Sequence, residues 1–174
     1  QPQIFRSVVF DSGSHKTTED NMKRISKLAS GLLATSIVIS SLIIPSTTVF
    51  AALGVEIDEY EFPDKNFREY LKTLDANGND FLEDIELYDI TSINCSGREI
   101  ESLEGIEWFF NLESLHCENN KLKTLNLSEI DDLTYVDCSE NELTSLIPNK
   151  NIEQIICYSN ELKSLDVSNS HKII

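Results

Sequence analysis

The segment LESLHCENNKL (residues 112–122) recurs twice along the chain, as LTYVDCSENEL (133–143) and as IEQIICYSNEL (152–162). In each copy two apolar residues stand three places apart, and a cysteine, an asparagine and a leucine follow at fixed spacings. An earlier segment, ITSINCSGREI (90–100), shares the apolar and cysteine positions but carries Arg98 in place of the asparagine. Self-similarity at a period of about 20 residues predicts a solenoid, in which each repeat buries its apolar face against its neighbours.

Residue alternation within each repeat assigns an inward and an outward face to a short strand. In the first quoted segment Leu115 and Cys117 face one side and His116 the other, because side chains alternate along a strand. The chain then turns and returns along a leucine pair, Leu122 and Leu125, which closes a coil with the apolar residues inside. Equivalent strands are expected to stack as a parallel sheet about 4.8 Å apart.

An asparagine stands at the turn of each of the three later repeats, at Asn120, Asn141 and Asn160. An amide side chain offers donors and an acceptor that can satisfy backbone groups left unpaired by a tight buried bend. We therefore expect these amides to form a ladder from coil to coil. Arg98 takes this place in the first repeat, as a terminal coil allows.

The repeat from Ile90 onward is similar to the leucine-rich-repeat family pattern L-x-x-L-x-C-x-x-N-x-L. Its first unit resembles the 22-residue repeat of internalin-type bacterial proteins, and the later units resemble shorter Cys/Asn repeats of exported Gram-positive proteins. The resemblance implies an α/β solenoid, a right-handed leucine-rich-repeat superhelix with a parallel concave sheet and about four coils over residues 90–174. A new coil would begin at Ile173, so we expect the native protein to continue beyond Ile174.

The cysteines, Cys95, Cys117, Cys138 and Cys157, all occupy the same inward strand position. In an exported chain cysteines ordinarily form disulfides. Here parallel side chains on neighbouring rungs aim their Cβ atoms alongside each other rather than toward each other. A zinc site would need pairs such as C-x-x-C, which the sequence lacks. We therefore predict a stack of buried free thiols.

The N-terminal third carries a basic run (22–27), an apolar stretch (28–44) and small residues before Ala52. This order predicts a secretory signal peptide over residues 22–51. The apolar stretch is shorter than the roughly 20 residues of a membrane span. We expect a secreted or cell-surface protein with no stable membrane span after cleavage, and interpret residues 1–21 as upstream translation outside the native protein.

The charge of the chain excludes two classes of partner. The full sequence has 14 basic and 30 acidic residues, a net charge of −16. Residues 1–51 contain five basic and three acidic residues, so residues 52–174 carry nine against 27, a charge of −18. Binding to nucleic acid or to an anionic membrane surface needs clustered Lys and Arg, so neither partner is expected.

Residues 52–89 precede the repeats and contain a helix followed by a loop. The apolar residues Phe67, Leu71 and Leu74 share one helical face, which predicts a helix over 62–74. The loop that follows, residues 75–86, resembles the calcium loop of an EF-hand. The resemblance implies Ca²⁺ as the candidate cofactor, with ligands from Asp75, Asn77, Asn79, the backbone carbonyl of Phe81, and Glu86.

One residue departs from the EF-hand pattern, because Asp80 stands where a glycine makes the sharp turn. Aspartate can adopt a positive φ, although at some cost. The alternative, which the sequence leaves open, is a helical cap that covers the open end of the solenoid without metal, as internalin-type caps do.

The outward strand positions form columns on the concave face. The candidate ligand-binding residues are Asn94, His116, Glu118, Tyr135, Asp137, Gln154, Ile156 and Tyr158. Aromatic rings among short polar groups are typical of recognition surfaces. By resemblance the expected partner is a protein, with a glycan as a less favoured choice, and the alternative function is a spacer or targeting module of a larger surface adhesin or enzyme.

A catalytic function is not expected for this chain. His116, Asp137 and Ser139 would lie on neighbouring strands and superficially resemble a hydrolase triad. A shallow open sheet, however, offers no evident oxyanion hole, pocket or exclusion of water. We therefore predict a binding module and no enzyme.

Overall fold

The computed structural model describes residues 54–170 and 172, which lie within one compact unit. The predicted signal peptide (22–51), the upstream segment (1–21) and the expected start of a new coil at Ile173 lie outside the described residues. Within the described residues, none of the helices has the length and apolar character needed to cross a membrane. The helices and strands before the repeats are β1 (Gly54–Glu56), α2 (Lys65–Leu71), β2 (Phe81–Glu83) and α3 (Asp84–Asp89).

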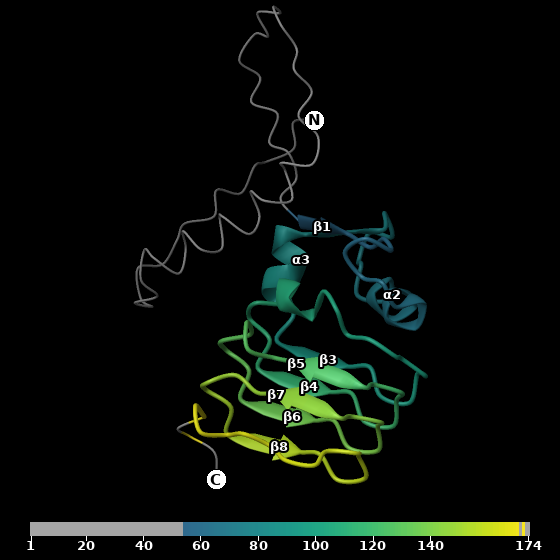
Figure 1. Cartoon of the computed structure of the whole chain (residues 1–174). Coiled ribbons are helices and arrows are strands. Elements are labelled where there is room, and N and C mark those ends of the chain that lie inside the picture. The colour runs from purple at the N-terminus through teal and green to yellow at the C-terminus, as the bar shows by residue number, and fades with distance from the viewer. Residues whose placement is uncertain (1–53, 171, 173–174) are drawn as a thin grey trace, which may run out of the picture. The chain divides into compact units, whose positions relative to one another are not determined.

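The repeats form a stack of short strands joined by turns (Figure 1). The elements are β3 (Ser92–Asn94), the 3₁₀ helix η2 (Ile106–Trp108), β4 (Ser114–His116), β5 (Thr124–Asn126), β6 (Tyr135–Asp137), β7 (Ser145–Ile147) and β8 (Gln154–Ile156). Strands β3, β4, β6 and β8 make one four-stranded parallel sheet, with Leu115 opposite Ile93 and Val136. The predicted leucine-rich-repeat solenoid with a parallel concave sheet is therefore confirmed.

The return side of the coils forms a second sheet. Strands β5 and β7 pair in parallel, and Leu125 lies opposite Leu146. The sequence predicts a return along leucines but no strand there. The L-x-L alternation of Leu125 and Leu127, both buried, is the signal that indicates this strand.

Inward-facing apolar side chains fill the interior of the stack. Leu115, Leu122 and Val136 are fully buried, and the core runs without a break from Val55 to Ile152. On β8, the last rung of the described sheet, Ile155 is only partly buried. Each rung therefore obtains its burial from the rung stacked on it, as in other solenoids.

The turn asparagines form hydrogen bonds between successive coils. The Asn120 Oδ1 accepts the backbone N–H of Arg98 at 2.9 Å and that of Ile100 at 3.0 Å. Its Nδ2 donates to the carbonyls of Cys95 and Cys117 at 3.0 and 3.1 Å. Asn141 and Asn160 repeat this arrangement one and two rungs further on. The amides thus form a ladder that satisfies buried backbone groups on both sides of each turn.

The residues before the repeats cover the outer edge of β3. The Tyr70 hydroxyl accepts the N–H of Asn94 at 3.1 Å, and the Arg98 guanidinium lies 4.8 Å from the Tyr70 ring centroid. Asp64 caps α2 through Oδ1, which accepts the Phe67 N–H, and its Oδ2 accepts the N–H of Glu101 in the first coil. The edge strand is therefore paired by side chains rather than left open.

Helix α2 is shorter than the helix predicted over 62–74. Asp64 is its N-cap, so Pro63 precedes the helix instead of occupying its first turn. The Arg68 guanidinium then binds the carbonyls of Phe62 and Pro63 ahead of the helix. This shorter helix still places Phe67 and Leu71 in the core.

Removing one ladder amide should destabilise the solenoid. Asn141→Ala leaves the Leu122 N–H and the carbonyls of Cys117 and Cys138 without this partner in a buried turn. We expect the free energy of unfolding to fall by about 2–4 kcal/mol in urea titrations. The matched control is Asn126→Ala, an exposed asparagine whose Oδ1 accepts the N–H of Ser128 two residues away, with an expected loss below about 1 kcal/mol. Equal losses in both variants would contradict a special role for the ladder.

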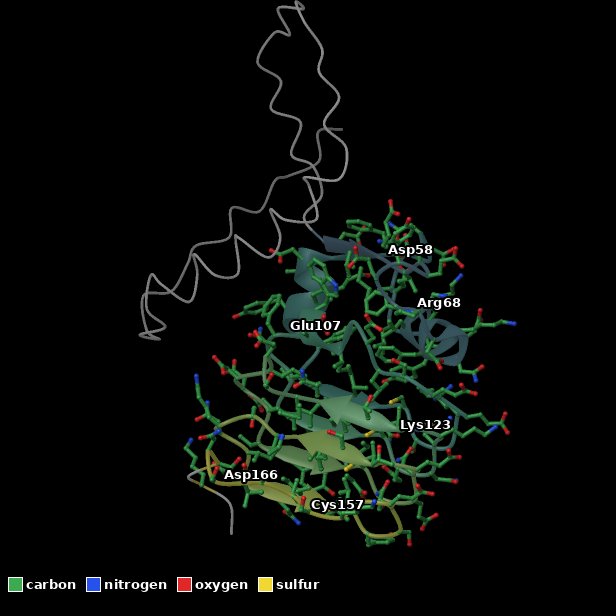
Figure 2. All side chains as sticks on the ribbon, viewed as in Figure 1. Asp58, Arg68, Glu107, Lys123, Cys157 and Asp166 are labelled. Atoms are coloured by element: carbon green, nitrogen blue, oxygen red, sulfur yellow. The ribbon has the colours of Figure 1, made fainter. Side chains whose placement is uncertain are left out.

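The cysteine side chains line the inside of the concave sheet. Cys95, Cys117 and Cys138 are fully buried, Cys157 is partly exposed, and all four are free thiols. Figure 2 shows sulfur atoms set one above another through the strands, with Cys157 on the last rung. The Cys117 Sγ donates to the Asp137 carbonyl at 3.4 Å. Burial raises the pKa of Cys95 and of Cys138 to about 12, and it raises that of Cys117 well above its usual range.

These thiols predict a loss of stability at alkaline pH. Unfolded thiols titrate near pH 8.5, whereas the folded ones titrate near pH 12. Above about pH 8.5 the unfolded state therefore releases protons that the folded state keeps, and stability declines by about 1.4 kcal/mol per pH unit for each buried thiol. Urea unfolding under reducing conditions between about pH 8 and 11 measures this slope. Cys117→Ala should make the slope shallower by one thiol, and an unchanged slope would refute the burial argument.

Candidate binding face

The outward-facing residues of the four-stranded sheet define the concave face. Strand register sets Asn94, His116, Asp137 and Ile156 side by side in one row across the four strands. Ser92, Ser114, Tyr135 and Gln154 form the neighbouring row. Ser96, Glu118, Ser139 and Tyr158 follow two residues further along each strand. All eight sequence-predicted ligand residues thus belong to three adjacent rows of one sheet.

His116, Glu118, Tyr135 and Asp137 form the central cluster of this face. The rings of His116 and Tyr135 lie with centroids 5.1 Å apart and planes tilted by 41°. The pKa of Tyr135 is raised, first by burial and then by the negative charges of Asp137 and Glu118. Two carboxylates therefore lie close enough to one aromatic ring to act on it electrostatically. All four side chains are partly exposed.

Glu118 has an unsatisfied carboxylate oxygen. Its Oε2 is covered by surrounding atoms and accepts no hydrogen bond from the described residues. Buried polar atoms are nearly always paired, so an orphan of this kind calls for an explanation. Alternation along the strand predicts that Glu118 faces outward, but it cannot predict that one oxygen stays without a donor.

Ser139 does not have the geometry of an activated nucleophile. Its side chain is only 1% exposed, and its Oγ donates to Asp137 Oδ1 at 2.6 Å. The Ser139 N–H donates to the same oxygen at 3.0 Å. The carboxylate thus holds the hydroxyl, which has no contact with His116 of the kind that a hydrolase triad requires.

The remaining candidate residues lie at the edges of the face. Tyr158 is 61% exposed on the last described rung, and Gln154 and Asn94 are exposed as well. Ile156 is partly buried beside Asp137. Aromatic and apolar groups therefore flank the central cluster toward β8, whereas small polar groups flank it toward β3.

The loop over residues 75–86 is organised around the Asp75 carboxylate. Asp75 is 8% exposed, and its Oδ1 and Oδ2 accept the N–H groups of Gly78 and Asp80, both at 2.8 Å. Asp80 has φ 61°, the left-handed conformation expected at this place from the EF-hand resemblance. Asn77 Oδ1 and Asn79 Oδ1 accept the N–H groups of Asn79 and Phe81.

Glu83 is a loop residue that the sequence reasoning missed. Its carboxylate accepts the amides of Asn77 at 3.1 Å and Asn79 at 2.9 Å. Glu86 accepts the N–H of Ala76 through Oε1 and the N–H of Glu83 through Oε2. The signal that could have found Glu83 is its ninth place in the loop, where EF-hands often bind calcium through water.

Glu83 and Glu86 influence each other's protonation. A hydrogen bond with Glu86 lowers the pKa of Glu83 to about 2. Burial, followed by the hydrogen bond with Glu83, raises the pKa of Glu86. The pKa values of the two carboxyl groups are therefore shifted in opposite directions. Within residues 54–170, the structure brings no three His, Cys, Asp or Glu side chains together as a metal site.

Comparison with known proteins places the fold. No family model matches the chain, and no curated protein matches it. Among solved structures, internalin C2 from Listeria monocytogenes matches 69% of this chain with a TM-score of 0.57 and 19% identity. The functional domain of InlJ from the same organism, which includes a cysteine ladder, matches 69% of this chain with a TM-score of 0.49 and 25% identity. A structure of the CBM51-2 and INT domains of Clostridium perfringens ZmpB matches 48% with a TM-score of 0.41 and 27% identity.

The chain spans only part of each of these structures. It covers 56% of the internalin C2 chain, 32% of the InlJ chain and 18% of the ZmpB chain. The likeness to internalin C2, together with the strand register and the asparagine ladder, assigns the chain to the leucine-rich-repeat fold that internalins have.

Proposed function

We propose that this chain is a binding module that recognises a protein ligand through its concave face. The observation that supports the proposal is the central cluster, in which aromatic and acidic side chains project, partly exposed, from a rigid parallel sheet. Tyrosines on a rigid surface lose little conformational freedom on binding, and they are enriched at binding hot spots.

A secreted or surface-exposed location is part of the proposal, because it agrees with the predicted signal peptide. The alternative function is a spacer or targeting module within a larger surface protein. The two differ in one expectation, since a spacer needs no specific chemistry on its concave face. The clustering of His116, Glu118, Tyr135 and Asp137 favours recognition.

Alanine substitutions on the face should weaken ligand binding. The chain is screened against arrays of extracellular protein domains and of glycans, and the variants Tyr135→Ala and Tyr158→Ala are then titrated against each hit. We expect each variant to lower the affinity for a protein hit about tenfold or more, or about 1.4 kcal/mol. The matched control is Tyr60→Ala, because Tyr60 is 90% exposed and lies before the repeats.

Three outcomes contradict the proposal. A hit whose affinity depends on Tyr60 and not on Tyr135 or Tyr158 would move the ligand site off the concave face. Hits on glycans alone would replace the protein ligand with a carbohydrate. The absence of any hit on either array would favour the spacer.

We also propose that the loop over residues 75–86 binds Ca²⁺. The chemistry of the donor set fits a hard cation, since every candidate ligand offers oxygen. The left-handed Asp80 and the N–H groups gathered by Asp75 give the backbone the course that such a loop needs. Bound calcium would be held by Asp75, Asn77, Asn79, the Phe81 carbonyl and Glu86, with Glu83 at the ninth place of the loop.

Calorimetry tests the calcium proposal. Titration of the chain with CaCl₂ near pH 7 should release or absorb heat, and Glu86→Gln should abolish it because the closing carboxylate is lost. Affinity should weaken as the pH falls toward the raised pKa of Glu86, because a protonated carboxyl is a poor ligand. The matched control is Glu56→Gln, an exposed glutamate on β1 outside the loop. If the unsubstituted chain gives no heat at millimolar calcium, the calcium proposal is wrong. The alternative, a helical cap that covers the solenoid end without metal, then remains.

A further inference from the structure

We infer that the segment recognised by the concave face is cationic, carrying arginine or lysine side chains that sit on the central cluster. The inference rests on the proposed function and specifies the chemistry of the partner. It stands on three observations: the signs of the charges on the face, the aromatic rings beside them, and a carboxylate oxygen without a donor.

The charges on the concave face have one sign. Glu118 and Asp137 lie on adjacent strands, and the outward positions of residues 92–96, 114–118, 135–139 and 154–158 include no lysine or arginine. Four lysines elsewhere in the described residues pair with acids off the face, in the ion pairs Lys72–Asp80, Lys121–Glu99, Lys150–Asp131 and Lys172–Glu153. The two face carboxylates therefore have no counter-ion among these pairs. A partner with positive charge would supply the missing complement.

The aromatic rings favour an organic cation over a simple ion. A guanidinium or ammonium group is attracted to the face of a tyrosine ring, most strongly where nearby water is removed. The chain already contains this arrangement at the edge of the same sheet, where Arg98 lies over Tyr70. Tyr135 offers the equivalent ring at the centre of the face, with His116 at its side and two carboxylates within electrostatic range.

The carboxylates still have hydrogen-bonding capacity to offer. Asp137 Oδ1 accepts the N–H and the hydroxyl of Ser139, which orient the group, and the covered Glu118 Oε2 accepts no hydrogen bond from the described residues. The terminal torsion of glutamate is broad, so the Glu118 carboxylate can turn toward a donor that arrives on the face. A guanidinium has five N–H donors in a planar fork and can bind a carboxylate with two of them.

A second acidic area of the molecule provides the control. Glu104, Glu107 and Glu129 line a depression of about 300 Å³ next to β5, away from the concave strands. Glu107, labelled in Figure 2, accepts the Gly105 N–H there. This depression has carboxylates but no aromatic ring among its lining residues. Removing charge from this depression tests whether a cationic peptide is attracted by negative charge in general or is recognised by the central cluster.

Calorimetric titration with a defined peptide tests the inference. The probe is an eight-residue peptide of alternating arginine and serine, titrated into the full chain at about 0.15 M salt, where distant charges are screened. The paired variant Glu118→Gln with Asp137→Asn should lower the affinity at least tenfold. Tyr135→Leu should lower it two- to fivefold, as expected for the loss of a cation–π contact. The matched pair Glu104→Gln with Glu129→Gln removes the same charge and should change the affinity less than twofold.

Each alternative result overturns the inference. If both pairs of variants lower the affinity for the arginine peptide equally, the peptide is attracted by net charge alone. If the Glu104 and Glu129 pair lowers the affinity more, the peptide binds in the depression. A peptide with glutamine in place of arginine that binds as well would exclude a cation, as would failure of the arginine peptide to bind. Circular dichroism shows whether each variant is folded, and the isosteric substitutions on the exposed face are expected to leave the fold intact.

The proposed function and this inference can fail separately. A protein hit that loses affinity in Tyr135→Ala and Tyr158→Ala, yet keeps it in the Glu118 and Asp137 pair, would retain the concave site and reject the cationic ligand. A hit that is indifferent to all four residues would reject the concave site itself.

Discussion

The stacking of coils in this solenoid depends on hydrogen bonds to the backbone groups that are buried at each turn. Every repeat must reverse direction inside the molecule, where an unpaired carbonyl or N–H is costly. The ladder amides supply the missing partners, at Asn120, Asn141 and Asn160. Each Nδ2 donates to the cysteine carbonyl of the preceding coil, and each Oδ1 accepts the N–H at the start of the return segment of that coil. Because each amide spans two coils, the ladder holds the rungs in register, and the outward rows of the concave face follow from it.

The first coil lacks a ladder asparagine, and the segment before the repeats substitutes for the missing neighbour. Tyr70, Asp64 and Asn66 hydrogen-bond to the backbone of that coil at Asn94, Glu101 and Glu99. Phe62 extends the core by packing against Phe109. The segment before the repeats is thus joined to the first coil by side-chain hydrogen bonds and by a shared apolar core, so it belongs to the same packed unit as the solenoid.

The fold could be predicted from the sequence because the repeat period predicts a solenoid and the alternation of apolar and polar residues predicts its strands. The same alternation predicts whether each strand residue faces inward or outward. Distances between side chains on different coils do not follow from these patterns. The contact between His116 and Tyr135, the orphan oxygen of Glu118 and the role of Glu83 in the loop therefore emerge only from the structure. The same holds for Asn149, whose buried amide donates to Leu133, because its segment falls outside the repeated pattern.

The division between inward and outward residues explains why the sequence indicates the fold more clearly than the ligand. Leu115 and Cys117 are fully buried, and Asn120 is tied to backbone groups, so the fold constrains them closely. The outward neighbours His116 and Glu118 contribute backbone carbonyls to the sheet and the ladder, but their side chains lie outside the core, so their identities can change at little cost in stability. The Asp137 side chain has a local structural role, since it accepts the N–H and the hydroxyl of Ser139, whereas the Glu118 Oε2 has no donor among the described residues and is the feature of this face that the solenoid does not explain.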